Sequence, residues 1–215
     1  MILNVHGGSG QPDLGMHPAS ISLFVLEASF YSHRPLWALI IAGVFDRYPN
    51  LKLVIAEAGT SWVRPALNAM DRHHEKILAG NVGVLPLDSA VRTERRPSEY
   101  WSTNCWIGSS FMVREDALER HNVGVDRIMW GSDFPHMEGT YPHSREAIAH
   151  TFADIPEHEV TQMLGANAAS LYHFDLDALA PHTAHGPLVS EVAKGLTQLP
   201  DSTSLAFEPR ATGVA

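Results

Sequence analysis

The pattern of apolar and polar residues alternates between short apolar runs and longer stretches with helical spacing. Apolar runs of strand length occupy residues 2–5, 51–56 and 128–130, and residues 103–107 are also strand-like. Elsewhere, apolar residues recur every three or four positions, which predicts helices at residues 19–32, 35–44, 61–77, 114–121, 145–152, 157–164 and 167–172. Strands that alternate with helices form parallel sheets joined by right-handed crossovers. The pattern therefore predicts an α/β fold with four βα units.

Four βα units are half of a (β/α)₈ barrel, and a complete barrel typically needs about 250 residues. The chain has 215 residues, so we expect a partial TIM barrel over residues 1–176. From residue 177 to 215 the chain is rich in Ala, Pro, Gly, Ser and Thr, which predicts a C-terminal arm or disordered tail. The chain also begins inside a predicted strand. Residue 1 is therefore expected to be either the true start of the protein or a point inside a longer one, of which this chain is the downstream part.

Composition and charge narrow the class of partner. Hydrophobic residues make up 45% of the chain, enough for a core, and the formal net charge is −9. Lys and Arg form no cluster, so nucleic acid and anionic membrane surfaces are not expected partners. No apolar run approaches the roughly 20 residues that cross a bilayer. The expected partner is a small-molecule substrate.

Cysteine usage indicates the compartment. Cys105 is the single cysteine, which excludes an intrachain disulfide and a thiolate metal cluster. We therefore expect a cytoplasmic protein.

Polar residues stand at the ends of the predicted strands. They are His6, Glu57, Asn104 or Cys105, and Asp133. The carboxyl ends of parallel strands lie together, so His6, Glu57 and Asp133 are expected to converge. Imidazole and carboxylates suit Zn²⁺ or a similar divalent ion. The alternative is structural: His6 bonds to its glycine loop, Glu57 caps the next helix, and Asp133 caps a turn.

Two segments carry a resemblance to a known family. Residues 43–59, GVFDRYPNLKLVIAEAG, are followed by Trp62 and later by GSDFPH at residues 131–136. Together with GANAASLYHF at residues 165–174, they resemble the amidohydrolase-related family, in the branch that includes aminocarboxymuconate-semialdehyde decarboxylase. The resemblance runs from about residue 2 to 175.

The resemblance implies a metal-dependent hydrolase or carboxy-lyase on a TIM barrel. His6 resembles the family's metal ligand after the fifth strand, and Asp133 resembles its aspartate after the eighth. The chain would then hold approximately the last four βα units. The family's His-x-His pair after the first strand has no counterpart here, and Glu57 replaces the histidine that the family's decarboxylases carry after the sixth strand. Because of this replacement, the resemblance predicts hydrolysis more strongly than decarboxylation.

Two further residues are candidates because they lie in the loop beside Asp133. His136 and Glu138 are predicted to contact substrate. Histidines on the predicted helices, such as His74 and His121, are interpreted as surface or core residues, and Trp62 as a packing residue.

The leading hypothesis combines these residues into one activity. His6 and Asp133 bind a divalent metal ion, with Zn²⁺ expected first and Mn²⁺ as the alternative. Asp133 and Glu57 act as catalytic residues on a small, carboxylate-bearing molecule. The competing hypothesis is a catalytically silent half-barrel that associates with itself or with a missing N-terminal half, because an open sheet exposes its edges.

Overall fold

The computed structural model describes residues 1–80, 93–183, 186 and 188–207. It consists of two compact units, residues 1–107 and 108–215, and each unit is described by itself. The strand order β1-β2-β3-β4 follows the sequence in a four-stranded parallel sheet. The fold class predicted from the sequence, a partial TIM barrel of the α/β class, is confirmed.

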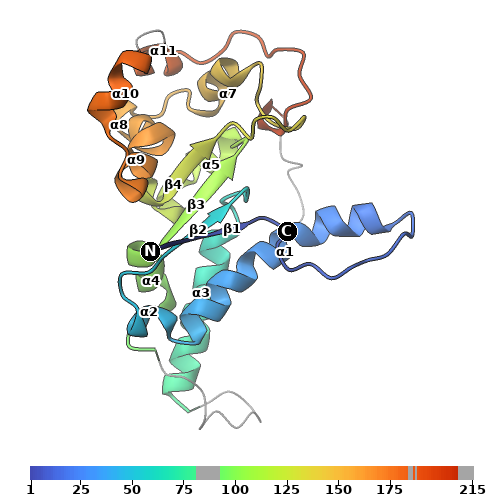
Figure 1. The fold of residues 1–215 in the computed structure, drawn as a ribbon, viewed down its shortest axis with the longest axis vertical. Coiled ribbons are helices and arrows are strands. Elements are labelled where there is room, and N and C mark those ends of the chain that lie inside the picture. Colours follow the sequence, from blue (N-terminus) through green and yellow to red (C-terminus); the bar gives the residue numbers. More distant parts are fainter. Residues whose placement is uncertain (81–92, 184–185, 187, 208–215) are drawn as a thin grey trace. The chain divides into compact units, whose positions relative to one another are not determined.

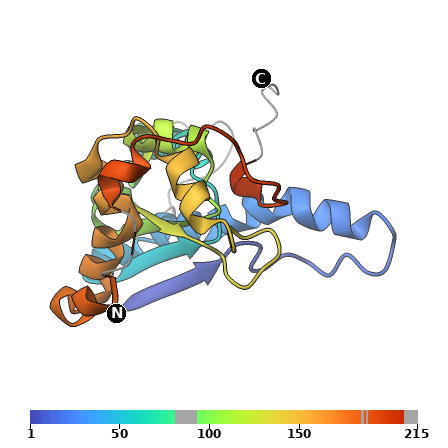
Figure 2. The ribbon, with the colours of Figure 1, turned by 90° about the horizontal axis from the view of Figure 1, so that it is seen from above.

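The first unit begins with two parallel strands that lie side by side (Figures 1 and 2). Their register pairs Ile2 with Lys52 and His6 with Ala56. The elements of this unit are β1 (Ile2–His6), α1 (Ser20–Ile41), α2 (Val44–Arg47), β2 (Lys52–Ala56), α3 (Val63–Leu78), α4 (Pro97–Asn104) and the first half of β3 (Cys105–Ser110). Leu53, Val54 and Ile55 of β2 are all buried, as expected for a strand covered on both faces.

The helix α1 differs from the prediction of two helices separated at Pro35. It is one continuous helix with Pro35 inside it. Leu36 and Ile40 are buried after the proline, and this packing holds the second half of the helix in line although proline disfavours it locally. Figure 1 shows the first half of α1 projecting beyond the strands of its own unit.

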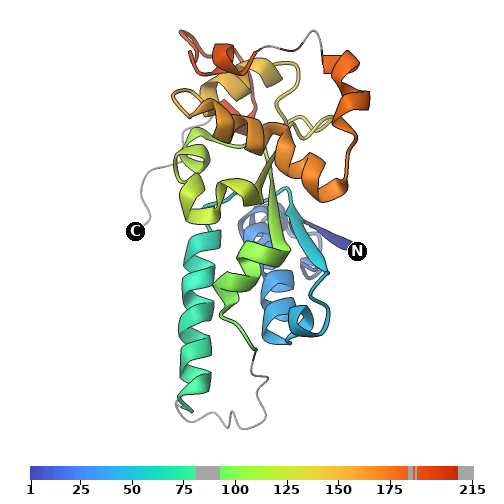
Figure 3. The ribbon, with the colours of Figure 1, turned by 90° about the vertical axis from the view of Figure 1, so that its left-hand side faces the viewer.

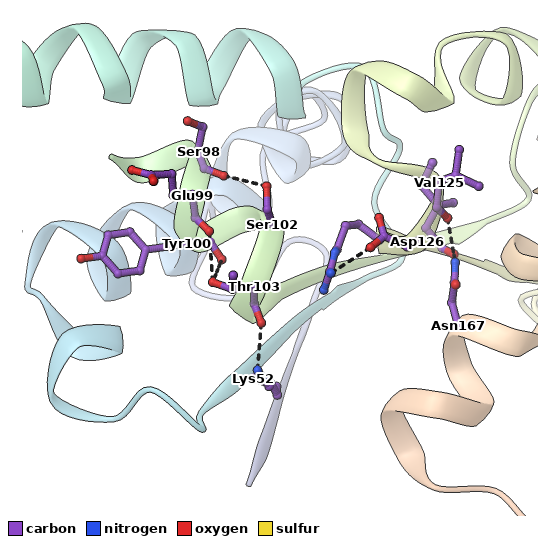
Figure 4. A network of polar contacts seen from close by, with 11 residues as sticks. Lys52, Ser98, Glu99, Tyr100, Ser102, Thr103, Val125, Asp126 and Asn167 are labelled. Carbon is purple, nitrogen blue, oxygen red and sulfur yellow. Dashed lines mark hydrogen bonds and ion pairs between the residues drawn. The ribbon is translucent and has the colours of Figure 1, made fainter. Parts of the chain in front are cut away.

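The helix α4 lies next to α3 in the first unit (Figure 3). Polar contacts fix its carboxyl end: Lys52 Nζ donates to Thr103 O at 2.8 Å, and Thr103 Oγ1 donates to Glu99 O at 3.0 Å (Figure 4). Residues 80–99 are interrupted by Gly and Pro, a pattern typical of a connector, and they fall largely on residues 81–92, outside the described residues.

The third strand begins later than predicted. Residues 103 and 104 end α4, and β3 runs from Cys105 to Ser110. Asn104 Nδ2 donates to the carbonyls of Pro49 and Leu51, at 2.9 and 2.8 Å. The prediction that Asn104 or Cys105 ends a strand is therefore wrong, because Asn104 ends α4 and Cys105 begins β3.

The second unit holds the end of β3, the last strand and a group of short helices. Its elements are α5 (Arg114–Leu118), α6 (Arg120–Val123), η1 (Val125–Arg127), β4 (Ile128–Gly131), α7 (Ser144–Thr151), α8 (Glu157–Thr161), the π-helix η2 (Gln162–Ala166), α9 (Asn167–Tyr172), α10 (Leu176–Thr183), α11 (Val189–Val192) and η3 (Leu205–Phe207). Asn167 Nδ2 ties α9 to the start of β4 by donating to Val125 O and Ile128 O, each at 2.7 Å (Figure 4). Gly165, a residue type common at helix ends, lies inside η2.

The segment predicted as an arm or tail contains helices in its described part. Ala206 and Phe207 are buried against Ala147 of α7. The predicted boundary at residue 176 stays a prediction. No helix among the described residues is long and apolar enough to cross a membrane.

Candidate active site

In the first unit, the ends of β1 and β2 bring His6 and Glu57 together. The parallel register places the two residues at the same end of neighbouring strands. His6 Nε2 lies 2.5 Å from Glu57 Oε2, and His6 Nδ1 lies 2.9 Å from the carbonyl oxygen of Gly7. The His6 side chain is 61% exposed and that of Glu57 is 22% exposed. The pair is therefore open to solvent on the imidazole side.

Both ring nitrogens of His6 face oxygen atoms that only accept hydrogen bonds. A carbonyl oxygen requires a proton on Nδ1, and a carboxylate oxygen 2.5 Å from Nε2 is matched by a proton on that nitrogen as well. A metal ion bound to Nε2 would take the place of that second proton. The arrangement suits a metal-binding histidine, whose second nitrogen commonly donates to a backbone carbonyl.

Gly7 allows the backbone after β1 to approach the backbone after β2 closely. A Cβ atom at Gly7 would lie 2.5 Å from the carbonyl oxygen of Glu57, closer than non-bonded atoms approach. Gly7 N donates to Ala56 O at 2.8 Å. The close approach therefore requires glycine at this position.

In the second unit, a loop after β4 carries Asp133, His136 and Glu138. His136 Nδ1 lies 3.0 Å from Asp133 Oδ2 and 3.9 Å from Glu138 Oε1. The distance to Asp133 is that of an ion pair once the ring is protonated, but its angle is not that of a hydrogen bond. Asp133 Oδ2 is consequently buried without a hydrogen-bond partner among the described residues. A buried carboxylate oxygen in this state is a ready ligand for a cation.

Backbone contacts hold this loop closed. His136 N donates to Asp133 O at 2.9 Å, and Thr140 N donates to Ser132 O at 2.9 Å. A Cβ atom at Gly139 would meet three backbone oxygens, those of Ser132, Asp133 and His136, at 2.8 to 3.0 Å. The loop also contains two cis peptide bonds, Phe134–Pro135 and Tyr141–Pro142.

Glu57 and Asp133 share an uncommon backbone conformation. Glu57 has φ +52° and Asp133 has φ +60°, in the left-handed region that costs most residues energy. Such residues concentrate at functional sites, where the surrounding structure holds them in place. No sequence pattern predicts this conformation at Glu57, because Glu has no preference for it.

The structure tests the sequence predictions residue by residue. It brings His6 to Glu57, and His136 to Asp133 and Glu138. The alternative in which Glu57 caps the next helix is wrong, since the N-cap residue of α3 is Trp62 and it makes no side-chain capping bond, whereas His6 does contact its glycine loop. The sequence pattern marks Gly7 as part of the glycine loop after His6, but it missed Gly139, which only close backbone contacts reveal.

Each unit offers a donor whose chemistry fits a divalent metal ion. In the first unit, His6 has an imidazole whose Nδ1 contacts a carbonyl, and in the second unit Asp133 has a buried oxygen without a hydrogen bond among the described residues. Histidine nitrogen and carboxylate oxygen suit Zn²⁺, and carboxylate oxygen also suits Mn²⁺. The role of each residue as a ligand remains a prediction.

Comparison with known proteins gives a consistent picture. A sequence model describing the amidohydrolases matches residues 26–174. Decarboxylase orsB of Emericella nidulans is 31% identical over 128 residues, which cover 59% of this chain and 32% of that protein. The chain thus spans about a third of this curated relative.

Solved structures show the same fold over about half of their own length or less. 5-Carboxyvanillate decarboxylase LigW from Sphingomonas paucimobilis matches with a TM-score of 0.59 and 22% identity, over 81% of this chain and 49% of that one. Amidohydrolase map2389c from Mycobacterium avium subsp. paratuberculosis K-10 matches with a TM-score of 0.55 and 26% identity, over 70% and 35%. A 5-carboxyvanillate decarboxylase from Novosphingobium aromaticivorans, solved with manganese, matches with a TM-score of 0.60 and 18% identity, over 80% and 47%.

Proposed function

The chain belongs to the amidohydrolase family, and from this premise we propose that it carries active-site residues of a metal-dependent carboxy-lyase. The substrate is a small carboxylic acid. The observation that carries the proposal is the 31% identity to a decarboxylase. This similarity favours decarboxylation over hydrolysis, although Glu57 differs from the histidine expected for the family's decarboxylases.

In this proposal His6 and Asp133 bind the metal ion. When bound, the ion would polarise a substrate oxygen and hold the substrate in place. Gly7 O fixes the His6 ring, so Nε2 points away from the backbone. Glu57 Oε2 pairs with His6 Nε2, and because that nitrogen is the one left for a metal ion, Glu57 would face the ion when one is bound. The relative solved with manganese makes Mn²⁺ the first ion to test and Zn²⁺ the second.

Asp133 is also the proposed proton carrier. Loss of carbon dioxide leaves an electron pair on the substrate carbon, and that carbon must take up a proton. Asp133 carries that proton on the carboxylate oxygen that does not hold the ion, and His136, whose Nδ1 lies 3.0 Å from Oδ2, resupplies the carboxyl group. In hydrolysis, the second reaction type, the same oxygen would instead take a proton from the attacking water. His136 and Glu138 contact the substrate at the rim of the loop.

The reaction is tested by carbon dioxide release. Purified protein reconstituted with Mn²⁺ or Zn²⁺ is assayed against benzoate and its hydroxylated derivatives. We expect release that His6→Ala abolishes. Release that is unchanged in His6→Ala, or the appearance of hydrolysis products alone, would contradict the proposal.

A second candidate is a subunit that works only after association with a second copy of itself. Six large apolar side chains on the first half of α1 are exposed: Ile21, Leu23, Phe24, Val25, Leu26 and Phe30. Apolar residues all around a helix normally require cover. Between residues 20 and 32 the only charged residue is Glu27. Because the chain has a net charge of −9, two copies would repel each other less through this part of α1 than through a more acidic surface. Sedimentation as a 23.6 kDa monomer would contradict this candidate. Dimers that Phe24→Asp disrupts would support it.

A further inference from the structure

A cavity lies at the amino ends of β1 and β2 in the first unit, at the opposite end of these strands from His6 and Glu57. Residues 1, 44 and 47–51 line it, and its volume is about 530 Å³. Small-molecule sites usually measure about 300–1,000 Å³. From Met1 to His6 the strand advances by roughly 17 Å, so a small molecule bound in this cavity would not contact His6 or Glu57.

One wall of the cavity, residues 48–51, is a turn that is fixed by hydrogen bonds. Leu51 N donates to Tyr48 O at 2.9 Å. The buried side chain of Asn104, at the end of α4, donates through Nδ2 to Pro49 O and to Leu51 O, at 2.9 and 2.8 Å. The wall is thus in place before a ligand arrives, and binding to it costs little reorganisation.

The lining combines an apolar floor with a polar rim. Leu51 is buried and Val44 is half-buried, whereas Arg47, Tyr48 and Asn50 are exposed. The apolar part of the lining is aliphatic and consists of Met1, Val44, Pro49 and Leu51. None of the described residues that line the cavity is acidic. The lining therefore suits a molecule with an aliphatic body and a polar head at the solvent side.

Arg47 determines which charge that head carries. Its Nη1 donates to Ala42 O at 2.8 Å, and in the part of the chain that the structure describes it forms no ion pair. The neighbouring Asp46 is engaged elsewhere, because it accepts hydrogen bonds from the Tyr100 hydroxyl and from Glu94 N. The remaining N–H groups of a guanidinium bind a carboxylate more strongly than a neutral acceptor.

We propose that this cavity is a second binding site, which takes a small aliphatic carboxylic acid as its anion. The aliphatic body packs against Val44 and Leu51, and the carboxylate pairs with Arg47. The site goes beyond the proposed function, because it uses neither the metal ion nor any residue of the candidate active site.

The test compares three probes by titration calorimetry on the full chain. Hexanoate has both the aliphatic body and the charge, hexanamide keeps the body without the charge, and acetate keeps the charge almost without the body. We expect hexanoate to bind about 10-fold more tightly than hexanamide, because it adds a charge-assisted contact. Acetate should bind at least about 10-fold more weakly than hexanoate, because it lacks four methylene groups.

Arg47→Gln tests the assigned cation, and Arg64→Gln is its matched control. Arg64 is an exposed residue of α3 in the same unit and does not line the cavity, so both variants lose one positive charge. Arg47→Gln should remove the preference for hexanoate over hexanamide and leave hexanamide binding unchanged, whereas Arg64→Gln should keep the preference. No binding of hexanoate, equal affinity for hexanoate and either other probe, a preference that survives in Arg47→Gln, or one that is lost in Arg64→Gln would overturn the inference.

His6→Ala separates this site from the candidate active site. Hexanoate should bind to this variant as it does to the wild type. If the variant lost hexanoate binding, the anion would be bound at the candidate active site, which would overturn the second site and leave the proposed function standing.

Discussion

The two acidic residues in left-handed backbone, Glu57 and Asp133, are held in different ways. Glu57 follows a buried strand directly and is positioned by its pairing with β1 and by the glycine opposite it. Asp133 lies in a loop that folds back on itself through hydrogen bonds between residues 132 and 140. The first arrangement depends on strand register and the second on turn geometry. Substitutions in the two places should therefore fail for different reasons.

The largest effects are expected at the two glycines that allow these conformations. Gly7→Ala places a methyl group 2.5 Å from a backbone oxygen, and Gly139→Ala meets three backbone oxygens at 2.8 to 3.0 Å. Because backbone cannot move aside as a side chain does, each change should lower the free energy of unfolding by about 3 kcal/mol. Denaturant unfolding measures this.

Gly165→Ala is the control for both glycines. A Cβ atom at Gly165 would meet no other atom within 4 Å, and the residue is in a helix, so alanine should be neutral or stabilise by up to about 1 kcal/mol. If the free energy of unfolding fell equally in all three variants, the close backbone contacts would not be the cause of the destabilisation.

The next largest effect, on metal affinity or turnover, tests whether the charge of the two acidic side chains matters apart from their shape. Glu57→Gln and Asp133→Asn keep the shape of each side chain but remove its charge. Asn tolerates left-handed backbone, so Asp133→Asn should fold normally. Both changes should lower metal affinity or turnover by roughly 10- to 100-fold. If Glu57→Gln leaves metal affinity and turnover intact, Glu57 is not a partner of the metal-binding histidine.

A smaller effect concerns pH and His33. Its folded-state pKa of about 4 lies below the unfolded value of about 6.5. The unfolded chain therefore binds the proton first, and stability falls as the pH drops from about 6.5 to 4. Since the ring is partly solvated, the loss is on the order of 1 kcal/mol. In His33→Gln, the unfolding free energy should depend less on pH over this range, as measured by denaturant titration at several pH values. The same pH dependence in the variant and the wild type would show that His33 does not have the lowered pKa.

The smallest effect tests the backbone strain itself. Glu57→Gly removes the Cβ that disfavours φ +52°, so it should raise the unfolding free energy by about 1 kcal/mol. The same change should abolish the His6 contact and weaken metal binding. Greater stability with weaker function is the expected result of strain held at an active site. Lower stability in Glu57→Gly would show that its side-chain contacts outweigh the strain.

Different parts of the molecule are predictable to different degrees. The strand β2 follows from the apolar run at residues 51–56, because a strand buried on both faces leaves that pattern. The family resemblance draws attention to His6 and Asp133. The predicted start of β3 is wrong because Asn104 bonds to carbonyls more than 50 residues away, and a local pattern carries no record of such contacts.

The remaining features depend on contacts between distant segments. The close approach of Gly7 to Glu57 and the stacking of His33 on Trp62 both join residues from separate elements. The continuous helix through Pro35 depends on buried neighbours that outweigh a local preference. Single-sequence patterns report local preference and burial, so these features emerge only from the structure.

Metal content tests the central claim most directly. Wild-type protein and the His6→Ala/Asp133→Ala double variant are reconstituted in parallel with Mn²⁺ or Zn²⁺, dialysed, and analysed by atomic emission, with Gly165→Ala as a folded control. The account predicts close to one ion per chain in the wild type and in the control, and none above background in the double variant. Equal metal in the wild type and the double variant, or none in either, would contradict it.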